Sequence, residues 1–174
     1  MKNWLFCKYV IACCFFLSMT AFNARANYTW IQVGVNGLTC SQCSRSVEMS
    51  IRKLDFVQDV VMNLQNTEGK IILKSGIKVD IKKIAKAIVD AGFSVRYINA
   101  GFTFENISVS HGYCYSHEGQ QFQFINVDPK TLHGEVTLKF LGKNFQTAKE
   151  YTIWKKELQV ACPKLQGETL YVTL

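Results

Sequence analysis

Two cysteines separated by two residues stand where a strand-like segment gives way to a helix-like segment. Polar and apolar residues alternate along residues 30–36, which is typical of a half-buried strand. Apolar residues then recur at helical spacing along residues 47–54. The loop between these segments, residues 37–43, therefore has to turn the chain and present Cys40 and Cys43 at the start of a helix.

The rest of the first half continues the same alternation of strands and helices. The predicted elements are strands at residues 57–64, 71–73 and 94–98, and a helix that begins after Asp80 and ends before Gly92. Asp80 is a favourable helix N-cap, and Gly92 suits the left-handed conformation that often follows a helix end. The complete order is βαββαβ, which predicts a ferredoxin-like fold for residues 27–98.

The first 26 residues are typical of a secretory signal peptide. They have a basic start, an apolar stretch at residues 9–22, and small residues at Ala24 and Ala26. The apolar stretch is shorter than the roughly 20 residues that a membrane-spanning helix needs. We therefore expect cleavage after about Ala26 and a soluble mature protein in the periplasm or outside the cell, with an uncleaved anchor as the alternative.

The charge of the mature chain is mild. Loss of Lys2, Lys8 and Arg25 with the signal peptide lowers the formal net charge from +7 to +4. No cluster of basic residues alternates with aromatic residues, so we predict that the protein does not bind nucleic acid. The sequence also has no paired carboxylates at meaningful spacing, no nucleophile–base set and no phosphate loop, so an enzyme is not expected.

Residues 99–174 predict a second small α+β domain of unknown role, joined to the first by a short joint at residues 99–101. Its predicted strands lie at residues 102–110, 121–127, 135–140 and 169–174. Thr147 and Glu150 have the spacing of a capping box, so a C-terminal helix should begin there and end before Pro163. Tyr151 and Trp154 lie on its apolar stripe and are expected in the core.

The cysteines of the second half have two interpretations. Cys114 can pair with Cys162, since a disulfide is the default in a small secreted domain. Alternatively, Cys114 and its neighbours His111 and His117 can form a second metal site. The disulfide is the favoured interpretation, and both stay open at this point.

Residues 30–98 resemble the heavy-metal-associated (HMA) domain family of copper chaperones, copper-pumping ATPase modules and the periplasmic mercury-binding protein. The family's loop, Gly-Met-Thr-Cys-x-x-Cys, is matched by Gly-Leu-Thr-Cys-Ser-Gln-Cys at residues 37–43. Further matches extend through the first helix and the second strand to residues 90–93. The resemblance implies a metallochaperone that binds metal at Cys40 and Cys43 and passes it to a metal transporter, including a membrane-embedded one, or to another carrier.

The residues of the loop bear on which metal is carried. Thiolates are soft ligands that favour Cu(I), and Thr39 stands where zinc-selective relatives carry Asp. Cu(I) is therefore the expected ion, with Hg(II) or another soft ion as the alternative. Leu38 replaces the family's Met and should pack beneath the loop, and Phe93 should shield the sulfurs.

Other interpretations of the cysteine pair belong to different functional classes. It can form a structural disulfide, or it can act as a thiol–disulfide oxidoreductase, although the thioredoxin pattern has another order of strands and helices. The chain can also be an interaction module that senses metal or docks on a partner through its second half.

Overall fold

The computed structural model describes residues 28–159, 162 and 169–174 of the 174-residue chain. The predicted signal peptide at residues 1–26 lies outside the described residues. Within the described part, none of the helices has the length and apolar character needed to cross a membrane.

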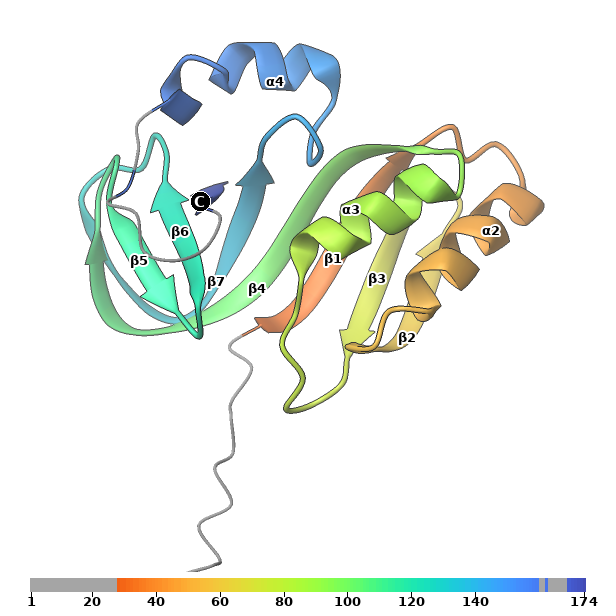
Figure 1. The fold of residues 1–174 in the computed structure, drawn as a ribbon, viewed down its shortest axis with the longest axis horizontal. Helices are drawn as coiled ribbons and strands as arrows, with labels where there is room; N and C mark the ends of the chain where they lie inside the picture. Colours follow the sequence, from red (N-terminus) through yellow and green to blue (C-terminus); the bar gives the residue numbers. More distant parts are fainter. Residues whose placement is uncertain (1–27, 160–161, 163–168) are drawn as a thin grey trace, which may run out of the picture.

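The described strands form one eight-stranded sheet in the order β2-β3-β1-β4-β7-β8-β6-β5 (Figure 1). The strands are β1 (Tyr28–Asn36), β2 (Val57–Asn63), β3 (Glu68–Leu73), β4 (Ser94–Val109), β5 (Cys114–His117), β6 (Gln120–Phe124), β7 (Lys130–Leu141) and β8 (Thr169–Thr173). The helices are α2 (Ser41–Arg52), α3 (Ile81–Asp90) and α4 (Ala148–Trp154), followed by the short 3-10 helix η1 (Glu157–Gln159). All neighbouring strands are antiparallel except β6 and β8, which are parallel.

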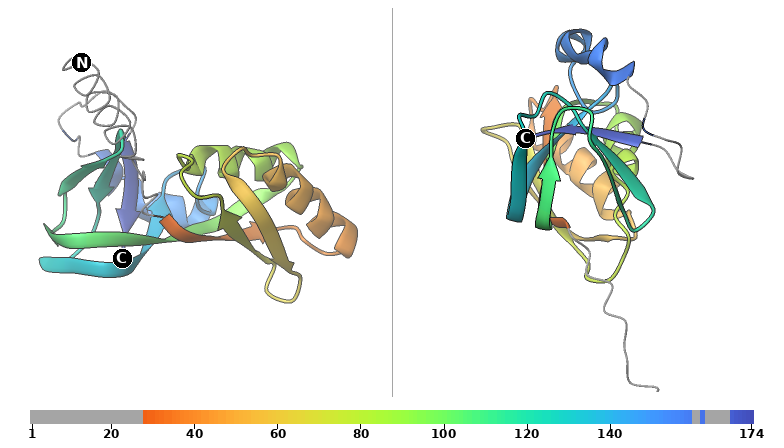
Figure 2. Two further views of the ribbon diagram at one scale, coloured as in Figure 1. Left: turned by 90° about the horizontal axis from the view of Figure 1, so that it is seen from below. Right: turned by 90° about the vertical axis from the view of Figure 1, so that its left-hand side faces the viewer.

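The first half has the predicted βαββαβ order. Both α2 and α3 cover one face of the β2-β3-β1-β4 part of the sheet (Figure 2, left). The Asp80 carboxylate caps α3 by accepting hydrogen bonds from the backbone N–H groups of Lys82 at 3.0 Å and Lys83 at 3.3 Å. Gly92 follows the helix with φ +91°, where a side chain would be strained. Both predicted helix boundaries are therefore confirmed.

Strand β4 continues through the predicted domain boundary. It pairs with β1 as far as Tyr28 opposite Phe102, and with β7 from Asn99 opposite Lys139 onward. The joint predicted at residues 99–101 is therefore wrong, because these residues lie inside β4 and Ala100 is fully buried. The mixed α+β class is confirmed, whereas a separate second domain at residues 99–174 stays a prediction.

Phe102 lies where the two halves meet and is 1% exposed. Its ring packs edge-on against Tyr28 of β1 at 5.1 Å between centroids, and against Phe122 of β6 at 5.4 Å. Apolar residues of both halves belong to one connected cluster of buried side chains. The described part of the chain therefore shares a single core.

The second half of the sheet bends away from β4 and β7, so that β5, β6 and β8 stand at an angle to them (Figure 2). β5 and β6 form a hairpin whose two turn residues, Glu118 and Gly119, have φ values of 46° and 72°. Positive φ at both positions is the conformation that tight two-residue hairpins prefer. Strand β5 was not among the predicted strands.

Helix α4 begins as predicted but is shorter and less buried. The Thr147 side chain accepts a hydrogen bond from the Glu150 backbone N–H at 3.3 Å, which confirms the capping box. The helix ends at Trp154, before the predicted end at Pro163, and none of its residues is buried. Tyr151 and Trp154 are only partly buried, so their placement in the core is wrong. Figure 1 shows α4 beyond the ends of the strands, not on a face of the sheet.

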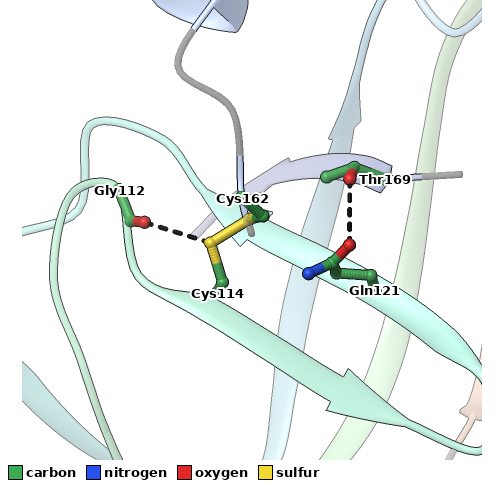
Figure 3. Close-up of a disulfide and its surroundings, with 5 residues drawn as sticks. All are labelled: Gly112, Cys114, Gln121, Cys162 and Thr169. Atoms are coloured by element: carbon green, nitrogen blue, oxygen red, sulfur yellow. Dashed lines mark hydrogen bonds between the residues drawn. A yellow bond between two sulfur atoms is a disulfide. The ribbon is translucent and has the colours of Figure 1, made fainter. Parts of the chain in front are cut away.

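The disulfide favoured for the second half is confirmed. Cys114 at the start of β5 is bonded to Cys162 upstream of β8 (Figure 3). His111 is engaged elsewhere, because its Nδ1 accepts a hydrogen bond from the Asn126 backbone N–H at 2.9 Å. Among the residues that the structure describes, no three His, Cys, Asp or Glu side chains are grouped as a metal site would require. The second metal site is therefore not supported.

The shared core predicts that both halves unfold together. Phe102→Ala should lower the free energy of unfolding by about 3–5 kcal/mol, because it removes a fully buried ring and leaves a cavity. Ile153→Ala, on a side chain that is 67% exposed, should change it by less than about 0.5 kcal/mol. Urea unfolding followed by circular dichroism and tryptophan fluorescence should give one transition, and two separate transitions would contradict a shared core.

The disulfide predicts a cross-linked peptide pair. Digestion of the unreduced chain without residues 1–26 should give one species that joins the Cys114 and Cys162 peptides and disappears on reduction. Mass spectrometry after alkylation under denaturing conditions is the measurement. Alkylation of both cysteines in the unreduced protein would show that the bond does not form.

Candidate metal-binding site

The cysteine loop joins the end of β1 to the first turn of α2. Gly37, with φ +90°, turns the chain out of the strand. Cys40 has extended backbone angles and is itself the N-cap of α2. Its Sγ accepts a hydrogen bond from the Cys43 backbone N–H at 3.2 Å, and its carbonyl accepts one from Ser44 at 3.1 Å. The first cysteine thus takes the place of the Ser, Thr or Asp that usually satisfies a free N–H at a helix start.

The two thiols differ in exposure. Cys40 is exposed and Cys43 is partly buried against the core, and both are free thiols in the structure. Incoming groups can therefore reach the Cys40 sulfur more easily than that of Cys43. Cys43 therefore holds its side of the pair against the core, and the Cys40 side is open to solvent.

Two apolar side chains support the loop. Leu38 is 5% exposed, so its predicted packing role beneath the loop is confirmed. The Phe93 ring packs at the start of the loop, where its Cδ1 lies 3.5 Å from the position that a Cβ on Gly37 would take. Both Phe93 and Cys43 pack against the same core. Direct shielding of the sulfurs by Phe93 stays a prediction.

The environment favours the thiolate of Cys43. Hydrogen bonding to the Cys40 side chain is the largest cause that lowers the pKa of Cys43, followed by hydrogen bonding to Thr39, whereas burial opposes the shift. A helix N-terminus adds to this, because its free N–H groups stabilise negative charge. Metal binding requires deprotonated cysteine, so the same hydrogen bonds reduce the competition between protons and a metal ion.

The arrangement suits a soft ion held by few ligands. Cys40 and Cys43 could supply two sulfur ligands, and within the described residues they do not belong to a group of three or more His, Cys, Asp or Glu side chains. Closed structural zinc sites use four protein ligands, which this loop does not provide. The site can therefore hold a two-coordinate soft ion and leave space for a ligand from another molecule. The sequence located both cysteines but did not show that Cys40 caps the helix, because Cys is not among the common N-cap residues.

The family model described as the heavy-metal-associated domain matches residues 32–94. Copper chaperone CopZ of Bacillus subtilis is 40% identical over 62 residues, which cover 35% of this chain and 87% of CopZ. The periplasmic component of a mercuric transport protein from Pseudomonas fluorescens is 32% identical over 63 residues, which cover 36% of this chain and 68% of that protein.

Larger proteins and solved structures also match. Copper-transporting ATPase 1 of Rhizobium meliloti is 36% identical over 69 residues, which are 40% of this chain and 8% of the ATPase. The chain thus spans less than a tenth of the copper-transporting ATPases that it matches. A solved structure of a CopZ metallochaperone has 27% identity and a TM-score of 0.36, with 38% of this chain and 97% of that chain covered.

The hydrogen bonds around Cys43 predict the pH dependence of its reactivity. The rate of alkylation of Cys43 should fall to half its maximum at a lower pH than for an unperturbed cysteine, because the thiolate is the reacting form. Thr39→Val should move this midpoint upward, since it removes a hydrogen bond that favours the thiolate. Gln42→Ala, an exposed change in the same loop, is the matched control. An unchanged midpoint in Thr39→Val would contradict the assigned role of Thr39.

Proposed function

The chain belongs to the heavy-metal-associated domain family, and from this premise we propose that it carries Cu(I) on Cys40 and Cys43 and delivers it by ligand exchange. The observation that carries the proposal is the geometry of the pair. The two thiols lie on one turn at the start of α2, where the Cys43 backbone N–H donates to the Cys40 sulfur, and no third His, Cys, Asp or Glu is grouped with them within the described residues. Such a site binds a soft ion without enclosing it.

The difference in exposure of the two thiols suggests the order of transfer. A thiolate of the receiving protein approaches from the solvent side and joins the ion as a third ligand. Cys40, the exposed thiol, is released first, while the partly buried Cys43 holds the ion until the second receiving ligand arrives. No bond to the ion has to break before a new one forms, so the barrier to transfer stays low.

The receiving protein is proposed to be a metal transporter or another metal carrier. The names of several relatives support this, since they are copper-transporting ATPases that match 64 to 69 residues of this chain. Hg(II) is the alternative cargo, because one relative is a mercuric transport component. Both ions are soft and suit two thiolates, so the coordination chemistry alone favours neither.

A periplasmic or secreted location fits two further observations. One relative is named as a periplasmic component, and the disulfide between Cys114 and Cys162 is of a kind that persists in oxidising compartments. Cys40 and Cys43 would then have to be kept reduced, or be protected by the bound ion. The predicted signal peptide agrees with this location.

An interaction module that senses metal or docks on a partner is the first alternative, and a thiol–disulfide oxidoreductase is the second, which the accessibility of the two thiols disfavours. Disulfide exchange needs an accessible attacking thiolate. Cys43, whose pKa is lowered, is only partly exposed. An insulin-reduction assay distinguishes the functions, because a metal carrier should show no turnover.

The proposal predicts stoichiometric binding of Cu(I). The reduced chain without residues 1–26 should bind one Cu(I) ion per molecule in an anaerobic competition with a chromogenic chelator. Cys40→Ser/Cys43→Ser should lose this binding, because hydroxyl oxygens are hard ligands that bind Cu(I) weakly. Ser41→Ala/Gln42→Ala alters the same exposed loop without removing a sulfur and should bind as the unchanged protein does. Equal binding by the serine variant would end the proposal.

A further inference from the structure

A cavity lies beside the N-terminal end of α3, at the opposite end of this helix from the cysteine loop. The C-terminal end of α3 leads through Gly92 to Phe93, which packs at the start of the cysteine loop. Its N-terminal end borders an open cavity of about 440 Å³. The ten residues of α3 separate the two places by roughly 15 Å. The cavity is therefore distinct from the metal-binding loop.

Positive charge dominates the first wall of this cavity. Lys78 lies in the segment before α3, and Lys82 and Lys83 lie in its first turn. The ammonium groups of Lys78 and Lys83 are exposed and have no carboxylate partner in the described part of the chain. Burial lowers the pKa of Lys82, while the nearby Asp80 opposes the shift. Three lysines thus line a volume typical of sites for small ligands.

Among the described residues that line the cavity, Asp80 is the only one with a carboxylate, and this group is already engaged. Asp80 accepts hydrogen bonds from the backbone N–H groups of Lys82 and Lys83, as the cap of α3. With three lysines and one aspartate, the described residues of the lining keep a net positive charge.

The second half of the chain supplies the opposite wall. The Gln120 amide is fixed, because its Nε2 donates to the Val79 carbonyl at 2.6 Å and its Oε1 accepts from the Tyr28 hydroxyl at 3.2 Å. At the hairpin turn, a Cβ on Gly119 would lie 3.5 Å from the Lys78 ammonium nitrogen. Leu170 of β8 adds a buried apolar surface. The lining residues Gly119, Gln120 and Leu170 all lie beyond residue 94, where the family match ends.

We propose that this cavity binds a small organic anion whose carboxylate or phosphate groups are held by Lys78 and Lys83. The ammonium groups supply the charge and the hydrogen-bond donors, and the apolar surface of Leu170 accommodates the rest of the ligand. Because its two hydrogen bonds, to Val79 and Tyr28, fix the Gln120 amide, this side chain shapes the wall of the cavity. The site depends on both halves of the chain and is independent of the metal that the loop carries.

Titration of the isotope-labelled chain with citrate and, separately, with inorganic phosphate tests this site at constant ionic strength. Amide NMR signals of residues 78–83 and 118–120 should shift and reach saturation. The anion that binds more tightly, citrate or phosphate, shows whether the site prefers carboxylate or phosphate groups. Lys78→Gln/Lys83→Gln should weaken binding by about tenfold or more, because two charge-assisted hydrogen bonds are lost. Lys74→Gln/Lys86→Gln removes the same charge from exposed positions outside the cavity and should leave the affinity unchanged.

Three outcomes would overturn the proposal. Shifts that rise linearly without saturation would indicate screening of charge and no site. Equal weakening in the two double variants would indicate a general electrostatic effect. Saturation by a glutamate-rich peptide, with none by citrate or phosphate, would assign the surface to an acidic protein partner.

Discussion

The pairing of β4 with two neighbours holds the molecule together. β4 pairs with β1 along one edge and with β7 along the other, so the cysteine-bearing half and the C-terminal half share one strand. A hydrogen bond from the Trp30 indole to Glu135 at 3.0 Å links β1 to β7 across β4. Burial of Phe102 at the same place joins the two cores. The lysine-lined cavity exists because this pairing places the β5–β6 hairpin beside the start of α3.

The chemistry of the proposed metal site follows from a single local event, the use of Cys40 as a helix cap. A cap must present an acceptor to the first N–H groups of the helix, and the Cys40 sulfur accepts from the Cys43 backbone N–H. The hydrogen bonds of the same turn lower the pKa of Cys43, and a soft metal needs deprotonated sulfur. Leu38 and Phe93 fix the loop from below, and the outer side stays open for exchange.

Local signals in the sequence predicted most of the first half, because caps and apolar periodicity are properties of neighbouring residues. Continuity of β4 could not be predicted in this way. Ala100 and Gly101 have the composition of a joint, but Ala100 is fully buried and Thr29 and Trp30 leave no space for a side chain at Gly101. The helical spacing of apolar residues in α4 likewise predicts an apolar stripe, but it does not tell whether a face of the sheet lies beneath the helix. Both wrong predictions concern contacts with residues that are distant along the chain.

X-ray absorption spectroscopy of the Cu(I)-loaded chain tests the central claim most directly, because it reports the atoms bound to the metal. With Cys114 and Cys162 joined, one chain has only Cys40 and Cys43 left to supply thiolate sulfur among its described residues. We expect a first shell of sulfur from these two residues and no nitrogen or oxygen ligand. A shell dominated by nitrogen or oxygen, or one that is unchanged in Cys40→Ser/Cys43→Ser, would contradict it.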